Sequence, residues 1–228
     1  MTAALILSAL GIGFAHSFET DHLLAVSNIV SSRNKLIKAI KDGLFWGLGH
    51  TSTILIVSIF FLTLKYQVNE KIFSYFEAIV GVMLVLLGTY RLIQLAKSYR
   101  MPIAEILPHT HAHHADTHSH THIVARPELE MKGFAHLSSY FIGTVHGLAG
   151  SGSVIIGVLA TMESIFSGYM YLLVFGIGSI GGMILAATTF GLPFTQKLIS
   201  NKIFQAILIV ASSLLSIYFG IKIIFEHI

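Results

Sequence analysis

The sequence contains no cysteine, which excludes both disulfide bonds and thiolate metal sites. Any bound metal must be held by imidazole, carboxylate, hydroxyl or backbone oxygen, and these donors suit nickel, cobalt or zinc better than copper(I). Charge is also scarce, because only 11% of the residues are Asp, Glu, Lys or Arg whereas 54% are hydrophobic. Soluble domains carry about 25% charged residues, so this composition indicates an integral protein of the lipid bilayer.

Three sequence patterns are also missing. The first apolar run has no Lys or Arg before it and no small-residue cleavage site after it, which indicates a membrane span rather than a removable signal peptide. The basic residues are scattered and no glycine-rich phosphate loop occurs, so no nucleic acid or nucleotide partner is expected. The His-Glu-x-x-His pattern of zinc hydrolases is absent as well, and the chain is not expected to be an enzyme.

The sequence does contain six apolar stretches long enough to cross a bilayer, which takes about 20 residues. They lie at 3–30, 42–64, 73–96, 134–160, 167–191 and 203–225. Lys and Arg are concentrated in the first, third and fifth linkers. The positive-inside rule therefore predicts a multi-pass protein of the cell membrane, with both termini outside and the third linker in the cytoplasm.

The two halves of the chain resemble each other. Residues 13–16 in the first span match 143–146 in the fourth, each a glycine followed three positions later by histidine. Residues 47–50 in the second span match 176–179 in the fifth at nearly the same spacing. Since each half has three spans, the second half must be inserted upside down relative to the first, as in transporters built from inverted repeats.

The predicted fold is therefore all-α, with six transmembrane helices arranged as two inverted three-helix repeats. The first repeat, a His-rich cytoplasmic loop and the second repeat are expected at residues 1–97, 98–132 and 133–228.

Four ionisable side chains lie within seven residues of the first span, namely those of His16, Glu19, Asp21 and His22. A charged group at membrane depth costs roughly 2.5–3.5 kcal/mol to insert, so such groups by default mark a transport or relay site. At about 100° per residue, His16, Glu19 and His22 share one stripe of a helix, while Asp21 lies on another face. Either the helix is distorted here or Asp21 orients a neighbouring imidazole, as carboxylates near metal sites commonly do.

His50 and His146 are further candidate ligands, because they lie on the second and fourth spans at positions related by the repeat. The predicted metal-binding residues are then His16, Glu19, Asp21, His22, His50 and His146. Neutral imidazole with carboxylate suits Ni²⁺, Co²⁺ or Zn²⁺, and the affinity order favours nickel over cobalt. The ion is expected to be the transported substrate, and no cofactor is expected.

These motifs carry a resemblance to a known family. His16, Asp21 and His22 fit the His-x-x-x-x-Asp-His motif of the nickel/cobalt transporter family, and residues 48–53 are similar to its second motif, Leu-Gly-His-Ser-Thr. The later aspartate-bearing motifs of that family are absent. Residues 146–152 instead resemble the compact urease-accessory-type nickel permeases and the broader sulfite-exporter-like superfamily.

The resemblance implies a permease for divalent nickel or cobalt in which His16, Asp21, His22 and His50 are the matched positions. Glu19 stands where the family usually has Asp. The resemblance also implies cytoplasmic partners that deliver metal or mature urease or hydrogenase. Uptake is the expected direction, and efflux through the same site is the first alternative.

Two alternatives come from other classes of protein. One is a membrane zinc hydrolase in which three histidines hold the metal and Glu19 activates water. The other is an anion exporter, which the superfamily resemblance alone suggests. Acidic side chains at the centre of the first span argue against a site for anions.

A second group of histidines lies in the third linker. Its members are His109, His111, His113, His114, His118, His120 and His122. Tracts of this composition bind transition metals. Because the tract lacks apolar periodicity, we expect a mobile cytoplasmic loop that exchanges metal quickly rather than one rigid site.

Overall fold

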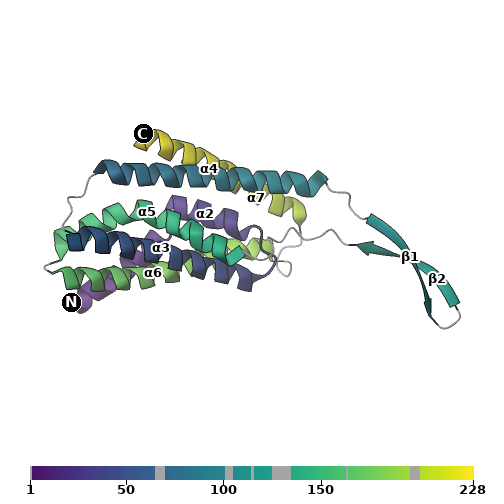
Figure 1. Cartoon of the computed structure of the whole chain (residues 1–228), viewed down its shortest axis with the longest axis horizontal. Coiled ribbons are helices and arrows are strands. Elements are labelled where there is room, and N and C mark those ends of the chain that lie inside the picture. The colour runs from purple at the N-terminus through teal and green to yellow at the C-terminus, as the bar shows by residue number, and fades with distance from the viewer. Residues whose placement is uncertain are drawn as a thin grey trace.

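The computed structural model describes residues 2–64, 70–100, 105–113, 116–124, 135–162, 164–195 and 201–228. The helices of these segments are α1 (Ala3–His16), α2 (Thr20–Val30), α3 (Leu36–Leu64), α4 (Glu70–Arg100), α5 (Ala135–Thr161), α6 (Ile165–Gly191), the short 3₁₀ helix η1 (Leu192–Phe194) and α7 (Lys202–His227). The long helices lie side by side, and both termini lie toward the end opposite the hairpin β1–β2 (Figure 1).

Four of these helices, α3, α4, α6 and α7, are long and apolar enough to cross a membrane. The pair α1 and α2, bent by 58° at a short break, makes a fifth candidate span if it is counted as one. The prediction of a helical multi-pass membrane protein is confirmed at this level. Helix α5 occupies the remaining predicted range, and the count of six spans stays a prediction.

The first predicted span is broken into two helices, which is the distortion that the helical angles gave as one alternative. Helix α1 ends at His16 and α2 begins at Thr20. The break is held by Ser17, whose Oγ donates to the carbonyl oxygen of Ser179 on α6 at 2.8 Å. The amide of Glu19 donates to the carbonyl of His16 at 3.1 Å. These bonds satisfy backbone groups that would be costly to leave unpaired within a membrane.

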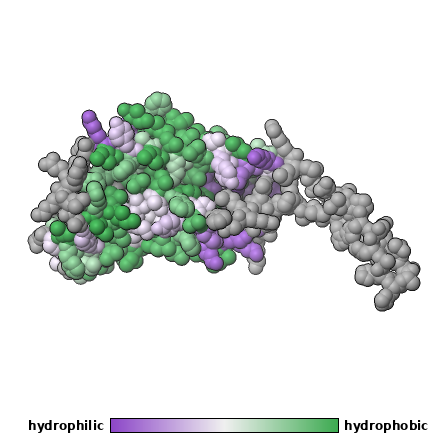
Figure 2. Space-filling view, viewed as in Figure 1, coloured by the Kyte–Doolittle hydropathy of each residue, from purple (hydrophilic) through white to green (hydrophobic). Residues whose placement is uncertain are grey.

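Apolar side chains face outward, as expected for a surface in contact with lipid. Leu7, Phe166 and Ile203 are each about 70% exposed. Hydrophobic residues cover most of the visible face of the helical body, and hydrophilic residues gather near its ends, especially the end that carries the hairpin (Figure 2). Polar side chains, including three of the histidines, are completely buried among the helices.

Glycines allow α3 and α5 to approach closely. A Cβ atom at Gly143 on α5 would overlap the carbonyl oxygen of Trp46 on α3. Conversely, a Cβ atom at Gly49 on α3 would overlap the carbonyl oxygen of Tyr140 on α5. Small residues at such positions bring two membrane helices into backbone contact, and here the contact lies next to a buried histidine on each helix.

A matching pair of glycine contacts joins α1 and α6. A Cβ atom at Gly13 on α1 would overlap the carbonyl oxygen of Phe175 on α6, and one at Gly178 on α6 would overlap that of Leu10 on α1. Gly13 and Gly143 occupy equivalent places in the sequence repeat, as do Gly178 and its counterpart on α3. The α1–α6 contact thus has the same pattern as the α3–α5 contact.

The His-rich tract contains two strands, and its role as a cytoplasmic loop that exchanges metal stays a prediction. Strands β1 (Glu105–His113) and β2 (Asp116–Val124) pair antiparallel, with His109 opposite His120 and His111 opposite His118. Apolar residues show no periodicity in this tract, but histidine alternates with threonine, alanine or serine at every second position. Alternation of this kind, with β-branched threonine, favours a strand. His114 lies outside the described residues.

Candidate metal centre

Four helical segments bring histidines into the middle of the helical body. His16 is the last residue of α1, and His22 lies in the first turn of α2. His50 and His146 lie within α3 and α5, where the glycine contacts between those helices hold them close. The exposed fraction is 9% for His16, 1% for His22 and zero for the other two. The break in the first span therefore lies at a buried polar centre.

The imidazole rings form one contiguous cluster around His22. Its ring centroid lies 4.6 Å from that of His16, 5.1 Å from that of His50 and 4.0 Å from that of His146. The rings of His16 and His50 are 5.3 Å apart. His16 and His22 are close in sequence, but His50 and His146 are far from them and from each other, so the cluster is a product of the fold.

Two carboxylates hold three of these rings in place. Glu19 Oε1 lies 2.8 Å from His16 Nδ1. Asp21 contacts two imidazoles, with Oδ1 at 3.2 Å from His22 Nδ1 and Oδ2 at 2.7 Å from His146 Nε2. An ionised carboxylate can only accept, so each of these ring nitrogens donates its N–H. The opposite nitrogen of each neutral ring then carries a lone pair that can bind a metal.

The nitrogens left over are buried and have no hydrogen-bond partner among the described residues. They are His16 Nε2, His22 Nε2, His146 Nδ1 and both ring nitrogens of His50. Buried polar atoms are nearly always paired, so five such atoms in one cluster require an explanation. A neutral imidazole offers one lone pair, so a bound cation would use at most one nitrogen of each ring, including one of the two of His50.

Two sets of potential ligand atoms are close enough to consider for one ion. The first comes from His16, His22 and His50, and the second from Asp21, His22 and His146, with the atoms of each set within 4.8 Å of one another. Two nitrogens bound at about 2.1 Å to one ion are at most about 4.2 Å apart. A small movement of the side chains would bring either set to coordinating distance.

Sequence reasoning did not identify the aromatic walls of this centre. Trp46 is completely buried, and its ring centroid lies 5.6 Å from that of His22 and 5.9 Å from that of His146. Phe175 lies 5.5 Å from His16 on the other side. The spacing of Trp46 and His50, four residues apart on one helix, would have indicated that the chain's one tryptophan faces the same way as the histidine.

The structure brings together all six residues predicted from the sequence. The helix is broken just before Asp21, and Asp21 also contacts two imidazole rings. The distorted helix and the orienting carboxylate, which the helical angles gave as alternatives, therefore occur together. Glu19 contacts the cluster through His16 and is otherwise more than half exposed. The histidines of the hairpin are separate from this centre, because β1 and β2 lie beyond the end of the helical body (Figure 1).

Comparison with known proteins identifies relatives of the chain. It is 34% identical to urease accessory protein UreH of Bacillus sp. (strain TB-90) over 226 residues, which cover 97% of this chain and 92% of that protein. It is 26% identical to Chloroplast protein FOR GROWTH AND FERTILITY 1 of Arabidopsis thaliana over 164 residues, 72% of this chain and 42% of that one. No family model and no solved structure matches. Similarity to UreH over nearly the full length of both proteins confirms the urease-accessory part of the predicted resemblance, and this chain therefore belongs to the UreH family of urease accessory proteins.

Proposed function

We propose that the chain is a secondary permease that takes up divalent nickel, and also cobalt, through the central cluster of His16, Glu19, Asp21, His22, His50 and His146, whose four histidines are buried. The observation that carries the proposal is that each of the four buried histidines has a ring nitrogen without a hydrogen-bond partner among the described residues of this membrane protein. Imidazole is a strong ligand for Ni²⁺ and Co²⁺, and three or more neutral nitrogens with one carboxylate suit a divalent ion.

Family membership supports nickel as the substrate. The relative UreH is named as an accessory protein of urease, and urease is a nickel enzyme. An accessory protein built as a bundle of apolar helices around imidazoles fits the supply of that metal. It also fits the expectation that the chain is not an enzyme, and cytoplasmic proteins that deliver metal to urease or hydrogenase are its candidate partners.

The paired glycine contacts support two inverted repeats, residues 1–97 and 133–228. The contact of α3 with α5 and that of α6 with α1 use equivalent glycines and equivalent carbonyl oxygens. A pseudo-two-fold axis that exchanges the halves would relate the two contacts. In such transporters the substrate site lies near the midplane between the repeats, and rocking of one repeat against the other exposes it alternately to the two sides.

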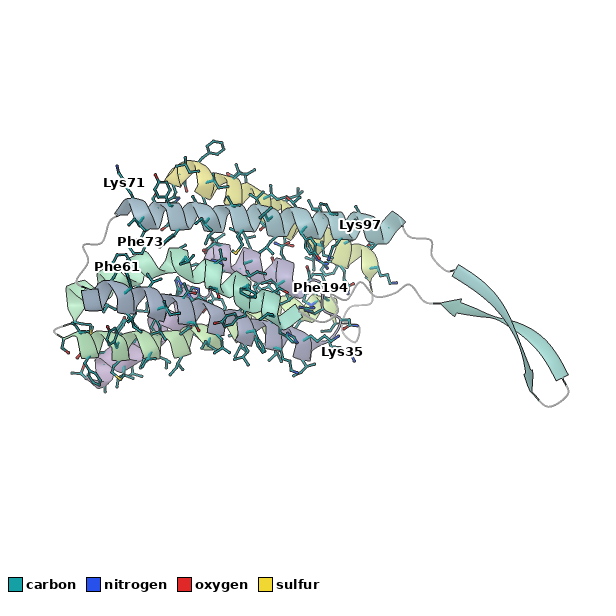
Figure 3. All side chains as sticks on the ribbon, viewed as in Figure 1. Lys35, Phe61, Lys71, Phe73, Lys97 and Phe194 are labelled. Carbon is teal, nitrogen blue, oxygen red and sulfur yellow. The ribbon has the colours of Figure 1, made fainter. Side chains whose placement is uncertain are left out.

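Charge supports an orientation with the termini outside. Lys35 and Lys97 lie toward the end of the body that carries the hairpin, and Lys71 lies at the opposite end (Figure 3). Four basic residues of the linkers, Lys65, Arg126, Lys132 and Lys197, lie outside the described residues. With the hairpin end in the cytoplasm, the membrane potential favours uptake by about 2.3 kcal/mol per charge per 100 mV, so a divalent ion gains about twice that.

The hairpin β1–β2 would then face the cytoplasm as a metal buffer. Two pairs of its histidines lie opposite one another in the strand register, His109 with His120 and His111 with His118. Ions released from the central site would be collected there before they pass to a partner protein. This role is auxiliary, because the central cluster has its own complete set of donors.

The test is accumulation of radioactive nickel in cells that express the chain, with the His22→Ala and Asp21→Asn variants at matched membrane abundance. The parent chain should raise accumulation, and both variants should abolish the increase. His136→Gln is the matched control, because His136 is a histidine of α5 outside the cluster, and it should transport like the parent.

Competition with cobalt and zinc ranks the substrates in the same assay. A fall in accumulation on expression of the parent would establish efflux and overturn the uptake proposal. Transport that survives in both central variants would overturn the assignment of the site.

A further inference from the structure

A cavity of about 320 Å³ connects the central cluster to one end of the helical body. Its inner end is formed by His16, Glu19, Asp21 and His22. Its sides come from α4, α5 and α7. Gly150 on α5 lies beside His16, and a Cβ atom there would lie 3.1 Å from His16 Nε2, so the glycine leaves the ring open to the cavity.

The outer part of the cavity is lined by the charged residues Glu77, Lys222 and Glu226. Glu77 lies near the start of α4, and the other two lie near the end of α7. With Glu19 and Asp21 at the inner end, the cavity has four carboxylates and one ammonium group along its length. A cleft lined mainly by one sign of charge concentrates ions of the opposite sign and raises their rate of association.

The ion pairs of the outer residues leave these carboxylates accessible. Lys222 Nζ lies 3.6 Å from Glu226 Oε1, and both side chains are about half exposed. A pair of this kind is weak and is screened by salt. His227 Nε2 lies 2.5 Å from Glu77 Oε2, and the Glu77 side chain is 43% exposed. A divalent cation can compete with each of these partners.

The inner end gives an independent sign of a cationic ligand. His16 and His22 are both more than nine-tenths buried and line the cavity. The Nε2 atom of each has no hydrogen-bond partner among the described residues. The acidic outer residues and the unpaired imidazoles therefore lie along one continuous space.

We propose that Glu77 and Glu226 form an outer capture site for hydrated divalent cations, and that this cavity is the route from the capture site to the central histidines. The inference rests on the proposed function. Carboxylate oxygens hold Ni²⁺ through its water ligands, which is weaker than direct imidazole binding. The ion therefore moves inward, exchanging water for His16 and His22. His227 occupies Glu77 when no ion is bound and is displaced when one arrives.

The test is the concentration dependence of nickel uptake by the full chain in cells. Glu77→Gln and Glu226→Gln together should raise the KM for Ni²⁺ about three- to ten-fold and leave the maximal rate unchanged, because only association is affected. The increase in KM should shrink at high ionic strength, since salt screens exposed charges. The affinity of the purified double variant for Ni²⁺ at the central site should equal that of the parent.

Three control variants separate charge from structure. Lys222→Gln removes the one positive charge of the same cavity and should lower the KM. His227→Gln removes the partner of Glu77 but keeps the carboxylate, and it should lower the KM as well. Glu77→Asp keeps the charge and should remain close to the parent.

The outcomes distinguish this proposal from the one on which it rests. A double variant with the KM of the parent, or one that loses maximal rate and central affinity together, would overturn the capture site and leave the permease intact. A parent chain that accumulates no nickel would overturn the proposed function itself.

Discussion

Two buried clusters of histidine and aspartate lie in this protein, and they differ in how completely their polar atoms are paired. In the central cluster, five imidazole nitrogens have no partner among the described residues. The second cluster surrounds Asp42 on α3, whose side chain is completely buried. Arg33 Nε and Nη2 donate to its two carboxylate oxygens at 2.5 and 3.2 Å. His136 Nδ1 lies 2.8 Å from Asp42 Oδ1, and Ser139 Oγ donates to the same oxygen at 2.9 Å.

The difference indicates two different uses of similar residues. The charge of Asp42 is balanced by Arg33, and both of its oxygens are hydrogen-bonded, so the cluster ties the α2–α3 connection to α5 and needs no ligand. The central cluster has carboxylates that orient imidazoles but nothing that uses the lone pairs they expose. Complete pairing is typical of a structural cluster, and the lack of partners in the central cluster supports its proposed use as a binding site.

The largest expected effect is on the stability of the Asp42 cluster. Asp42→Ala should lower the free energy of unfolding by about 3–5 kcal/mol, because it leaves Arg33 charged and only 6% exposed without its partner. Thermal unfolding of the purified protein in detergent measures the change. Nickel affinity of the fraction that remains folded should equal that of the parent. A variant as stable as the parent would contradict the structural assignment of this cluster.

The opposite result is expected at the centre. His50→Leu should weaken nickel binding at least about 100-fold, equivalent to about 2.8 kcal/mol of binding free energy. Stability should be unchanged or higher, since the substitution removes two unpaired buried nitrogens and keeps a side chain of similar volume. Isothermal titration with Ni²⁺ and thermal unfolding of the same preparation give both quantities. A loss of stability without a loss of nickel affinity would mean that the central cluster stabilises the fold and does not bind the metal.

Substitution of a glycine at a helix contact should have a smaller effect, and it should change both the stability of the protein and its nickel binding. Gly143→Ala should destabilise the protein by about 1–3 kcal/mol, because the added methyl group overlaps the backbone of Trp46 and forces α3 and α5 apart. It should also weaken nickel binding, since those helices carry His50 and His146. Gly181→Ala is the matched control, because nothing lies within 4 Å of its Cβ position. Equal effects of the two substitutions would show that close approach of α3 and α5 does not position the site.

The sequence predicted the membrane helices and the members of the central cluster for physical reasons that are local. Apolar runs of span length and ionisable groups within them are visible without knowledge of the fold. The helical angles allowed for a break near His16, but what holds it is not visible, because it depends on a hydrogen bond from Ser17 to Ser179, more than 160 positions away. The double contact of Asp21 likewise depends on where α5 places His146.

The two clusters also differ in how well sequence patterns reveal them. Arg33 and Asp42 lie at the edge of a basic linker, where the positive-inside rule explains the arginine and no pattern indicates a buried pair. The residues of the central cluster stand out because histidine and carboxylate are rare in apolar runs. The hydrogen-bond partners of a side chain on another helix can be identified only from the fold. The fold also shows which of the two clusters has polar atoms without partners.

The smallest expected effect concerns the hairpin, which lies outside both clusters. Replacing residues 105–124 with a short Gly/Ser linker should change the free energy of unfolding by less than about 0.5 kcal/mol, as is typical of changes away from a core. The initial rate of nickel uptake at saturating Ni²⁺ should be retained, because all members of the central cluster lie on α1, α2, α3 and α5 or on the short connection between α1 and α2. The number of nickel ions bound per chain at equilibrium should fall, since the hairpin histidines are removed with the segment. Loss of uptake in this variant would mean that release from the central site requires the hairpin as acceptor, and the hairpin would then belong to the transport path rather than to a buffer beside it.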